Sequence, residues 1–461
     1  MQIKIALILS IILFEWSNAD KLLFIQAIWR HGSRTPVNCN WNCEYFLQND
    51  LLNGELTPTG MRQHFSLGQW MKKRYIKDYK LLNETYNASE IVVYSTDVNR
   101  TIMSAMSNLQ GMYSNNGPNI PNVSDNYLIP PNPGAKSPTD IGQSAIHYNL
   151  QILPIHMKEA ITDEGLLSIL ICPKGYEMFS QNMESNLTMN VIQKAQNTLT
   201  QFCNEMNIDP LEFNIFTLTE YMDTFYSCIY NDYPMPSTLT QTTFKQADSL
   251  YALTIALQLY QTWQQISIFS SPFFESLLSY FDSALNQSQI QNQYKYIIYS
   301  AHDINVQLIA SALNFTSAEC MAQVYLGQEV NNKNCIYTYP GFASNIIWEL
   351  WQDDISHDHY IKILYNGTEM NLCNTDSKQC SYQLFKQLIL NQKYDFQKEC
   401  QDIDPIIQQK VPIWMTTLII IFLVIFLALL FYICYLFRQL KQKNIKTLNE
   451  DQRNLNQYYD S

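Results

Sequence analysis

The sequence carries little charge, and most of that charge is negative. Charged residues make up 15% of the 461, and 29 Lys and Arg stand against 41 Asp and Glu, for a formal net charge of −12 at pH 7. Nucleic-acid binding depends on dense positive charge, so this balance argues against a nucleic-acid partner. Internal repeats and low-complexity arrays are also missing, so no repeat architecture is expected. Hydrophobic residues still reach 47%, enough for a large core.

Metal-binding patterns are missing as well. None of the eleven cysteines stands at zinc-ligand spacing together with histidines. The stretch 353–359 is rich in Asp and His and could in principle form a metal site with His302. It is better explained as a solvated turn between two strands. We therefore expect no metal and no other cofactor.

The cysteines that are present favour disulfides. Cys434 lies inside an apolar C-terminal run. The remaining ten form an even set, as is typical of an oxidising compartment. These ten are Cys39, Cys43, Cys172, Cys203, Cys228, Cys320, Cys335, Cys373, Cys380 and Cys400.

Two apolar runs predict how the chain meets the membrane. Residues 1–19 have the positive start, short apolar stretch and small-residue cleavage site of a secretory signal. Residues 411–437 contain no charge and are long enough to span a bilayer. The basic residues after that run place the polar tail, 438–461, in the cytoplasm. We therefore predict a single-pass type I membrane protein.

Glycosylation sequons agree with that compartment. Seven are expected at the surface: Asn83, Asn87, Asn122, Asn186, Asn286, Asn314 and Asn366. An eighth sequence match, at Asn99, is expected to lie in a buried pocket instead.

Three predicted strands end in charged or imidazole side chains. The apolar run 22–29 reads as a buried strand and leads into Arg30-His31-Gly32-Ser33-Arg34-Thr35-Pro36. The β-branched run 90–97 precedes Arg100, and the strand 294–300 precedes His302 and Asp303. Ligands of open α/β sheets bind at the carboxyl ends of strands, so these side chains are expected to lie together at that end of the sheet.

The other predicted elements are less closely tied to chemistry. A helix begins with Thr57 as N-cap and Pro58 at its first position, which makes His64 a structural helix residue. Asp97 is expected to cap the helix that carries Arg100. Residues 140–245 are read as helices and loops, 244–269 as one long helix, and 346–351 and 360–365 as strands, the second ending at the turn Asn366-Gly367.

The residues at the strand ends suit phosphoryl transfer. Three arginines and an imidazole can clamp the non-bridging oxygens of a phosphoryl group without a metal. His31 lies among cations, which keep it unprotonated, so it can attack phosphorus and form a covalent phosphohistidine. Asp303 can protonate the leaving alcohol and then help to activate water.

At these positions the chain resembles the histidine acid phosphatases. Residues 30–36 match their Arg-His-Gly-x-Arg-x-Pro signature, and 95–101 look like their Ser-Thr-Asp-x-x-Arg-Thr strand end. Residues 300–303 look like their His-Asp, and 54–64 are similar to their Gly-x-Leu-Thr-x-x-Gly-Met-Arg-Gln-His helix entry. The resemblance covers roughly residues 22 to 400. Ser33 departs from it, because many members carry Asp there, but it lies outside the bond-making set.

The resemblance implies a fold and a set of roles. The fold is a phosphoglycerate-mutase-like three-layer α/β domain with a central mixed sheet and an inserted helical cap. It would occupy residues 20–405, with the cap at about 125–245. The implied roles are His31 as nucleophile, Asp303 as proton donor, and Arg30, Arg34, Arg100 and His302 as phosphate binders.

The signal, span and short tail look most like the lysosomal and prostatic acid phosphatase branch. That resemblance suggests the disulfides Cys172–Cys400 and Cys373–Cys380. Pairing Cys203 with Cys228, and Cys320 with Cys335, is a guess that the branch does not support, and no partner is assigned to Cys39 or Cys43.

We thus expect an acid phosphatase that hydrolyses small phosphate monoesters at acidic pH. A phytase or a lysophosphatidic acid phosphatase is a narrower alternative, although a phytase pocket would be expected to carry more Lys and Arg. A surface receptor or adhesion protein on an inactive phosphatase scaffold is a third. The expected location is the lysosome, another acidic endomembrane compartment or the cell surface, and a homodimer remains open.

Overall fold

The computed structural model describes residues 20–41, 44–47, 53–124, 127–211, 213–286, 294–373 and 375–401. The predicted signal 1–19, span 411–437 and tail 438–461 lie outside these ranges. Within them, no helix combines the length and apolar character needed to cross a bilayer.

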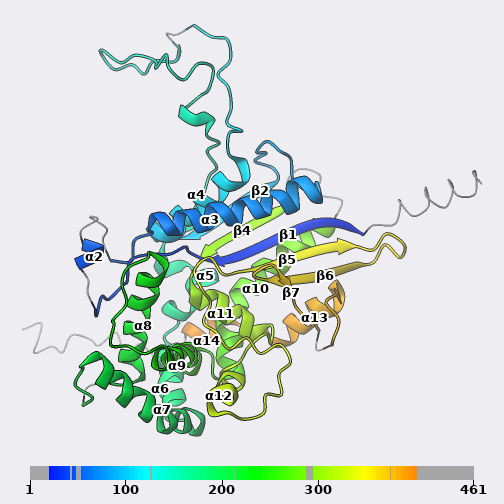
Figure 1. Ribbon diagram of the computed structural model, residues 1–461. Coiled ribbons are helices and arrows are strands. Elements are labelled where there is room, and N and C mark those ends of the chain that lie inside the picture. Colours follow the sequence, from blue (N-terminus) through cyan, green and yellow to red (C-terminus); the bar gives the residue numbers. More distant parts are fainter. Residues whose placement is uncertain are drawn as a thin grey trace, which may run out of the picture. The chain divides into compact units, whose positions relative to one another are not determined.

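A mixed sheet forms the centre of the described domain (Figure 1). Its strands are β1 Lys21–Arg30, β2 Ile91–Thr96, β3 His156–Lys158, β4 Tyr296–Ala301, β5 Asn345–Gln352, β6 His359–Tyr365, β7 Thr368–Glu369 and β8 Cys380–Ser381. The order is β3-β2-β4-β1-β5-β6-β7, with β8 also paired to β6. The first four strands in this order run parallel, and β5 to β8 are antiparallel. The predicted mixed α/β sheet is therefore confirmed.

The central strands are apolar throughout because both faces of the sheet are covered. In β1, Ile25 and Trp29 point into one hydrophobic core, and Phe24 and Ile28 point into the other. Successive side chains of a strand alternate between faces, so a strand buried on both sides needs an uninterrupted apolar run. The sequence pattern that predicted a buried strand is explained by these two cores.

Helices cover the two faces unequally (Figure 1). The first core lies under α3 Pro58–Met71, η1 Lys72–Asp78 and α4 Asn99–Tyr113. The opposite face carries α5 Glu164–Ile171, α10 Trp263–Leu285, α11 Asp303–Ala312, α13 Tyr382–Gln392 and α14 Phe396–Gln401. Beyond them lie α6 Lys174–Met183, α7 Asn186–Met206, α8 Ile215–Tyr230, α9 Gln241–Leu259 and α12 Ala318–Leu326. The short elements are α2 Glu44–Leu47, η3 His147–Asn149 and η4 Ala160–Thr162.

Two helix starts test the predicted caps. Thr57 caps α3, its side chain accepting from the Gly60 amide, and Pro58 is the first helical residue, as predicted. The prediction for α4 was wrong, because its N-cap is Val98 and no side chain caps it. Asp97 is exposed one residue earlier.

Two further predictions are corrected by the structure. The stretch 244–269 is not one helix, because α9 ends at Leu259 and Thr262 caps α10 by accepting from the Gln265 amide. Tyr260 leaves the helical conformation and donates its hydroxyl to the Ile304 carbonyl. The region read as helices and loops also contains β3, which pairs parallel to β2. All three residues of β3 are exposed, so the sequence has no apolar pattern that would predict this strand.

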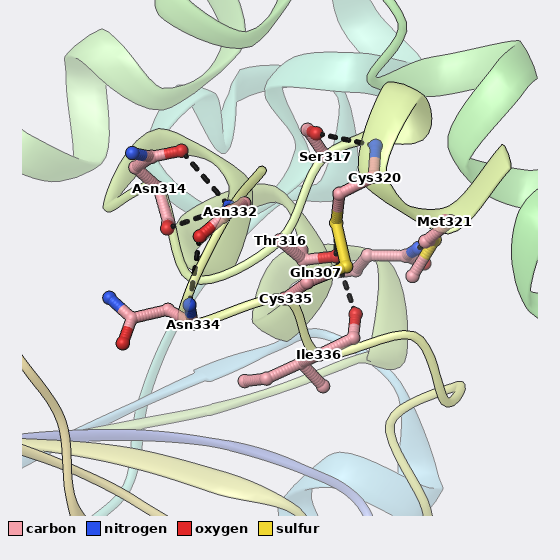
Figure 2. Close-up of a disulfide and its surroundings, with 10 residues drawn as sticks. All are labelled: Gln307, Asn314, Thr316, Ser317, Cys320, Met321, Asn332, Asn334, Cys335 and Ile336. Carbon is pink, nitrogen blue, oxygen red and sulfur yellow. Dashed lines mark hydrogen bonds between the residues drawn. A yellow bond between two sulfur atoms is a disulfide. The ribbon is translucent and has the colours of Figure 1, made fainter. Parts of the chain in front are cut away.

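The structure forms three of the predicted disulfides, Cys172–Cys400, Cys320–Cys335 and Cys373–Cys380. Figure 2 shows the second, which joins the first turn of α12 to the following loop beside the hydrogen bond from Thr316 to the Ile336 carbonyl. The suggested pair Cys203–Cys228 is not formed, because both thiols are free and buried in α7 and α8. Cys39 is disulfide-bonded.

Candidate active site

The loop 30–36 leaves the sheet at the carboxyl end of β1. Arg30 pairs with Ala301 at the end of β4, and the His31 amide donates to the Ala301 carbonyl. Gly32 is pressed against the start of α3, since a Cβ there would lie 2.3 Å from the Gly60 carbonyl oxygen. The Gly32 amide donates to Ser104 of α4 at 3.0 Å. Both helices on this face therefore fix the loop.

The imidazole of His31 is held in one tautomer. Its Nδ1 lies 2.8 Å from the Gly32 carbonyl oxygen, and a carbonyl can only accept, so Nδ1 carries the proton. The lone pair is then on Nε2. Burial lowers the pKa of His31 well below its usual value, and the charges of Arg30 and Arg34 lower it further. A buried, neutral imidazole has the protonation state that a nucleophile needs in acid.

Three guanidinium groups share the site. Arg30 donates to the Pro340 carbonyl at 2.7 Å and pairs with Asp303 at 2.8 Å. Arg34 pairs with Asp223 at 2.8 Å. Arg100 lies in the first turn of α4, where burial and the charge of Arg34 lower its pKa to about 10. In each of the three, Nε is buried and has no hydrogen-bond partner among the described residues. Three buried N–H donors left without acceptors indicate an anion site.

His302 and Asp303 follow β4 into α11. The His302 ring lies 5.6 Å from the His31 ring, centroid to centroid, and its Nε2 is 3.0 Å from the Thr96 hydroxyl at the end of β2. Burial and the charge of Arg100 lower the pKa of His302 to about 3. Burial alone would raise the pKa of Asp303, but Arg30 and Arg34 outweigh it and hold the carboxyl below its usual pKa.

The structure thus brings together all six residues that were predicted at this end of the sheet. They come from the ends of three strands and are Arg30, His31, Arg34, Arg100, His302 and Asp303. The sequence analysis missed Asp223, which belongs to α8 and lies 189 residues from its partner Arg34. Its signal is weak: Asp223 and Glu220 are the acidic residues of an otherwise apolar and hydroxyl-rich helix. Also missed was Phe342, whose ring lies 4.2 Å from the Arg30 guanidinium.

One expectation is wrong, that for Asn99, and the Asp- and His-rich stretch lies away from the site. Asn99 is exposed and donates to Glu55, so the sequon there is not in a buried pocket. The stretch 353–359 joins β5 to β6. It lies at the end of the sheet opposite the site, because Gln352 pairs with Lys21 at the beginning of β1. It is therefore far from His302. Within the described ranges, no group of three or more His, Cys, Asp or Glu is arranged to hold a metal ion.

Comparisons with known proteins bear on the family and the fold of the chain. Residues 21–366 match the model of the histidine phosphatase superfamily (branch 2). The lysosomal acid phosphatase of Xenopus laevis is 24% identical over 455 residues, 94% of this chain and 92% of that protein. The prostatic acid phosphatase of Bos taurus is 28% identical over 320 residues, 64% and 70%. Among solved structures, the phytase of Citrobacter braakii superimposes with a TM-score of 0.55 at 13% identity, covering 82% of this chain and 99% of that one.

Proposed function

The chain belongs to branch 2 of the histidine phosphatase superfamily, and from that membership we propose that it hydrolyses phosphate monoesters through a phosphohistidine formed on His31. The observation that carries the proposal is the set of three buried guanidinium Nε–H groups that find no acceptor among the described residues and that surround a neutral imidazole. A phosphoryl group supplies the acceptors that these donors lack.

In the first step, Nε2 of His31 attacks phosphorus, and the bond from phosphorus to the alcohol oxygen breaks. Arg30, Arg34 and Arg100 neutralise the charge on the non-bridging oxygens, and His302 assists them. The leaving oxygen takes a proton from Asp303. The charge of Arg30 holds the pKa of this carboxyl below its usual value. A bound phosphate dianion offsets the charge of Arg30 and raises the pKa of Asp303, so that the carboxyl takes up a proton from acidic solvent.

In the second step, water attacks the phosphohistidine. Asp303, now a carboxylate, accepts a proton from the water, and the phosphorus–nitrogen bond breaks. Inorganic phosphate is released and His31 returns to its neutral form. The low pKa of His31 suits a low working pH, because the nucleophile is not lost to protonation.

The phosphohistidine can be trapped directly. The full-length chain is mixed with a ³²P-labelled aryl phosphate, quenched in alkali and digested. We expect label on the peptide that contains His31. Exchange of His31 to Ala should remove the label and lower turnover by about 10⁴-fold or more.

His147→Ala is the matched control, because His147 is exposed and lies outside the site. Label that persists in the His31→Ala protein would contradict the proposal.

The narrower substrates remain alternatives within the same proposal. The Citrobacter braakii phytase is only 13% identical and supports the fold alone. Turnover of phytate, a lysophosphatidic acid and simple monoesters, measured side by side, separates the three.

We also propose that the domain is anchored by residues 411–437 with its tail, 438–461, in the cytoplasm. The charge-free run and the basic residues after it support this reading. The expected location is the lysosome, another acidic endomembrane compartment or the cell surface. Protease protection of a tail tag in intact vesicles tests the topology. Light scattering on the detergent-solubilised chain tests the homodimer.

A further inference from the structure

Helix α8, which comes from the cap region, is fastened along the segment 33–40. Asn231 donates its amide to the Ser33 hydroxyl at 3.0 Å, and Thr224 donates to the Asn38 carbonyl at 3.2 Å. Asp223 directly precedes Thr224 and pairs with Arg34, which lies between Ser33 and Asn38 in the segment. The cap is therefore joined to the catalytic loop at several points, and one of them is an ion pair with a predicted phosphate-binding arginine.

The pair between Arg34 and Asp223 uses only one edge of the guanidinium. Nη1 donates to Oδ2 at 3.0 Å, and Nη2 donates to Oδ1 at 2.8 Å. The second Nη1 hydrogen is taken by the Thr35 carbonyl at 2.9 Å. Nε–H is buried and has no partner in the described part of the chain. Since Nη2 makes one bond, the edge formed by Nε and Nη2 still has two hydrogens for two phosphoryl oxygens.

Arg34 needs a counter-ion to stay in this position. Its side chain is 8% exposed, and Arg30 and Arg100 are like charges in the same cluster. Repulsion in a buried site would turn an unpaired guanidinium away. The Asp223 carboxylate is itself fixed, because Oδ2 also accepts from the Val37 amide at 3.2 Å. The carboxylate therefore holds the guanidinium by its Nη1–Nη2 edge.

We propose that Asp223 is a positioning residue, which holds Arg34 by its Nη1–Nη2 edge so that the Nε–Nη2 edge is ready to bind the substrate phosphoryl group. The proposal rests on the proposed function and adds to it a residue from the cap. Asp223 does not touch the reacting atoms. Its effect reaches the substrate through Arg34, in the ground state and the transition state alike, so it acts on binding more than on the chemical step.

The test compares Asp223→Ala, Asp223→Asn and wild type as full-length chains. Inorganic phosphate serves as the probe, and its inhibition constant is measured together with kcat and KM for an aryl phosphate. We expect Asp223→Ala to raise the inhibition constant and KM by about tenfold, as for loss of a charge-assisted pair, with kcat within about twofold. Asp223→Asn retains one acceptor oxygen, so its inhibition constant and KM should lie between those of wild type and Asp223→Ala. Thermal unfolding shows whether α8 remains docked.

Glu220→Gln is the matched control. Glu220 is exposed, lies one turn earlier on α8 and accepts from the Asn40 side chain, so its exchange should leave phosphate binding unchanged. A second control is the Asp223→Ala, Arg34→Ala double variant, which is compared with Arg34→Ala alone. Calorimetry measures phosphate binding to both. If Asp223 acts through Arg34, its exchange should have no further effect once Arg34 is gone.

Three results would overturn the proposal: unchanged phosphate binding in Asp223→Ala, tighter binding in Asp223→Ala, or an additional loss in the double variant. Each presupposes an active wild type. A wild type that does not hydrolyse phosphate monoesters would instead overturn the proposed function.

Discussion

At the scale of single residues, burial decides the protonation of the site. His31, His302 and His64 are all buried, and burial is the main cause that lowers the pKa of each. The positive charges of the arginines beside His31 and His302 lower these pKa values further and so also favour the neutral imidazoles. His64 is different, because it lies on α3 beneath the loop and contacts the Arg30 carbonyl at 3.0 Å. Since a carbonyl only accepts, its Nε2 carries the proton.

His64 makes the stability of the domain depend on pH. Its pKa in the folded protein is about 4, because burial outweighs the hydrogen bond to Arg30. The unfolded chain has the ordinary value near 6.5, so between these values the unfolded state binds more protons. Stability from this group is therefore complete above about pH 6.5 and is lost as the pH falls toward 4, by roughly 3 kcal/mol.

We expect His64→Gln to reduce this acid sensitivity, because glutamine does not titrate but can still donate to the carbonyl. Denaturant unfolding at pH 7 and pH 4.5 measures the difference for both proteins. The same loss of stability in wild type and variant would show that His64 is not the group responsible.

At the scale of elements, two glycines let α3 and α4 approach closely enough to hold the loop between them. A Cβ at Gly68 would lie 2.0 Å from the Asn108 carbonyl oxygen, and one at Gly111 would lie 2.1 Å from the Phe65 carbonyl oxygen. These are backbone atoms, so a side chain cannot be accommodated by a rotamer change. The close packing fixes α4, which supplies Arg100 and Ser104.

Gly68→Ala should destabilise the domain by about 1–2 kcal/mol net, because an overpacking cost of up to about 3 kcal/mol outweighs the gain of about 1 kcal/mol in helix propensity. The inhibition constant for phosphate should also rise, since α4 shifts. Chemical unfolding and phosphate inhibition report the two effects. Gly165→Ala in α5 is the control, because a Cβ there meets only Asp163 at 3.7 Å, and it should be neutral or stabilising. Equal behaviour of the two variants would refute the packing argument.

At the scale of the whole molecule, disulfides join segments that are distant in the sequence. Cys172 follows α5 and Cys400 lies in α14, 228 residues later, so this bond ties the end of the described chain to the helices beside the sheet. Cys320–Cys335 closes a segment of only 15 residues. In the chain-entropy model, the longer loop restricts the unfolded state more.

Removing the Cys172–Cys400 bond by a double exchange to Ser should destabilise the domain by about 5 kcal/mol, against about 3 kcal/mol for Cys320–Cys335. Thermal and chemical unfolding of both variants measure the difference. A larger effect from the shorter loop would contradict the entropic explanation.

The sequence by itself determined the five longer strands, β1, β2, β4, β5 and β6, and which residues follow three of them. Continuous apolar runs mark β1 and β4 because both faces of the sheet are buried, and the chemistry follows each run directly. A residue that directly follows a strand is positioned by that strand. The sequence alone therefore places His31, Arg100 and Asp303 at the same end of the sheet. The turn at Asn366 and Gly367 was predictable in the same local way, and both residues have positive φ.

Only the tertiary structure decided what holds these residues in place. Asp223 reaches Arg34 across 189 residues, and the free thiols of Cys203 and Cys228 stay apart although an even count suggested a pair. The exposed strand β3 is set by pairing with β2 and not by its own composition. Contacts of this kind depend on how whole elements pack. A local sequence pattern does not specify which distant residue will be in contact with it.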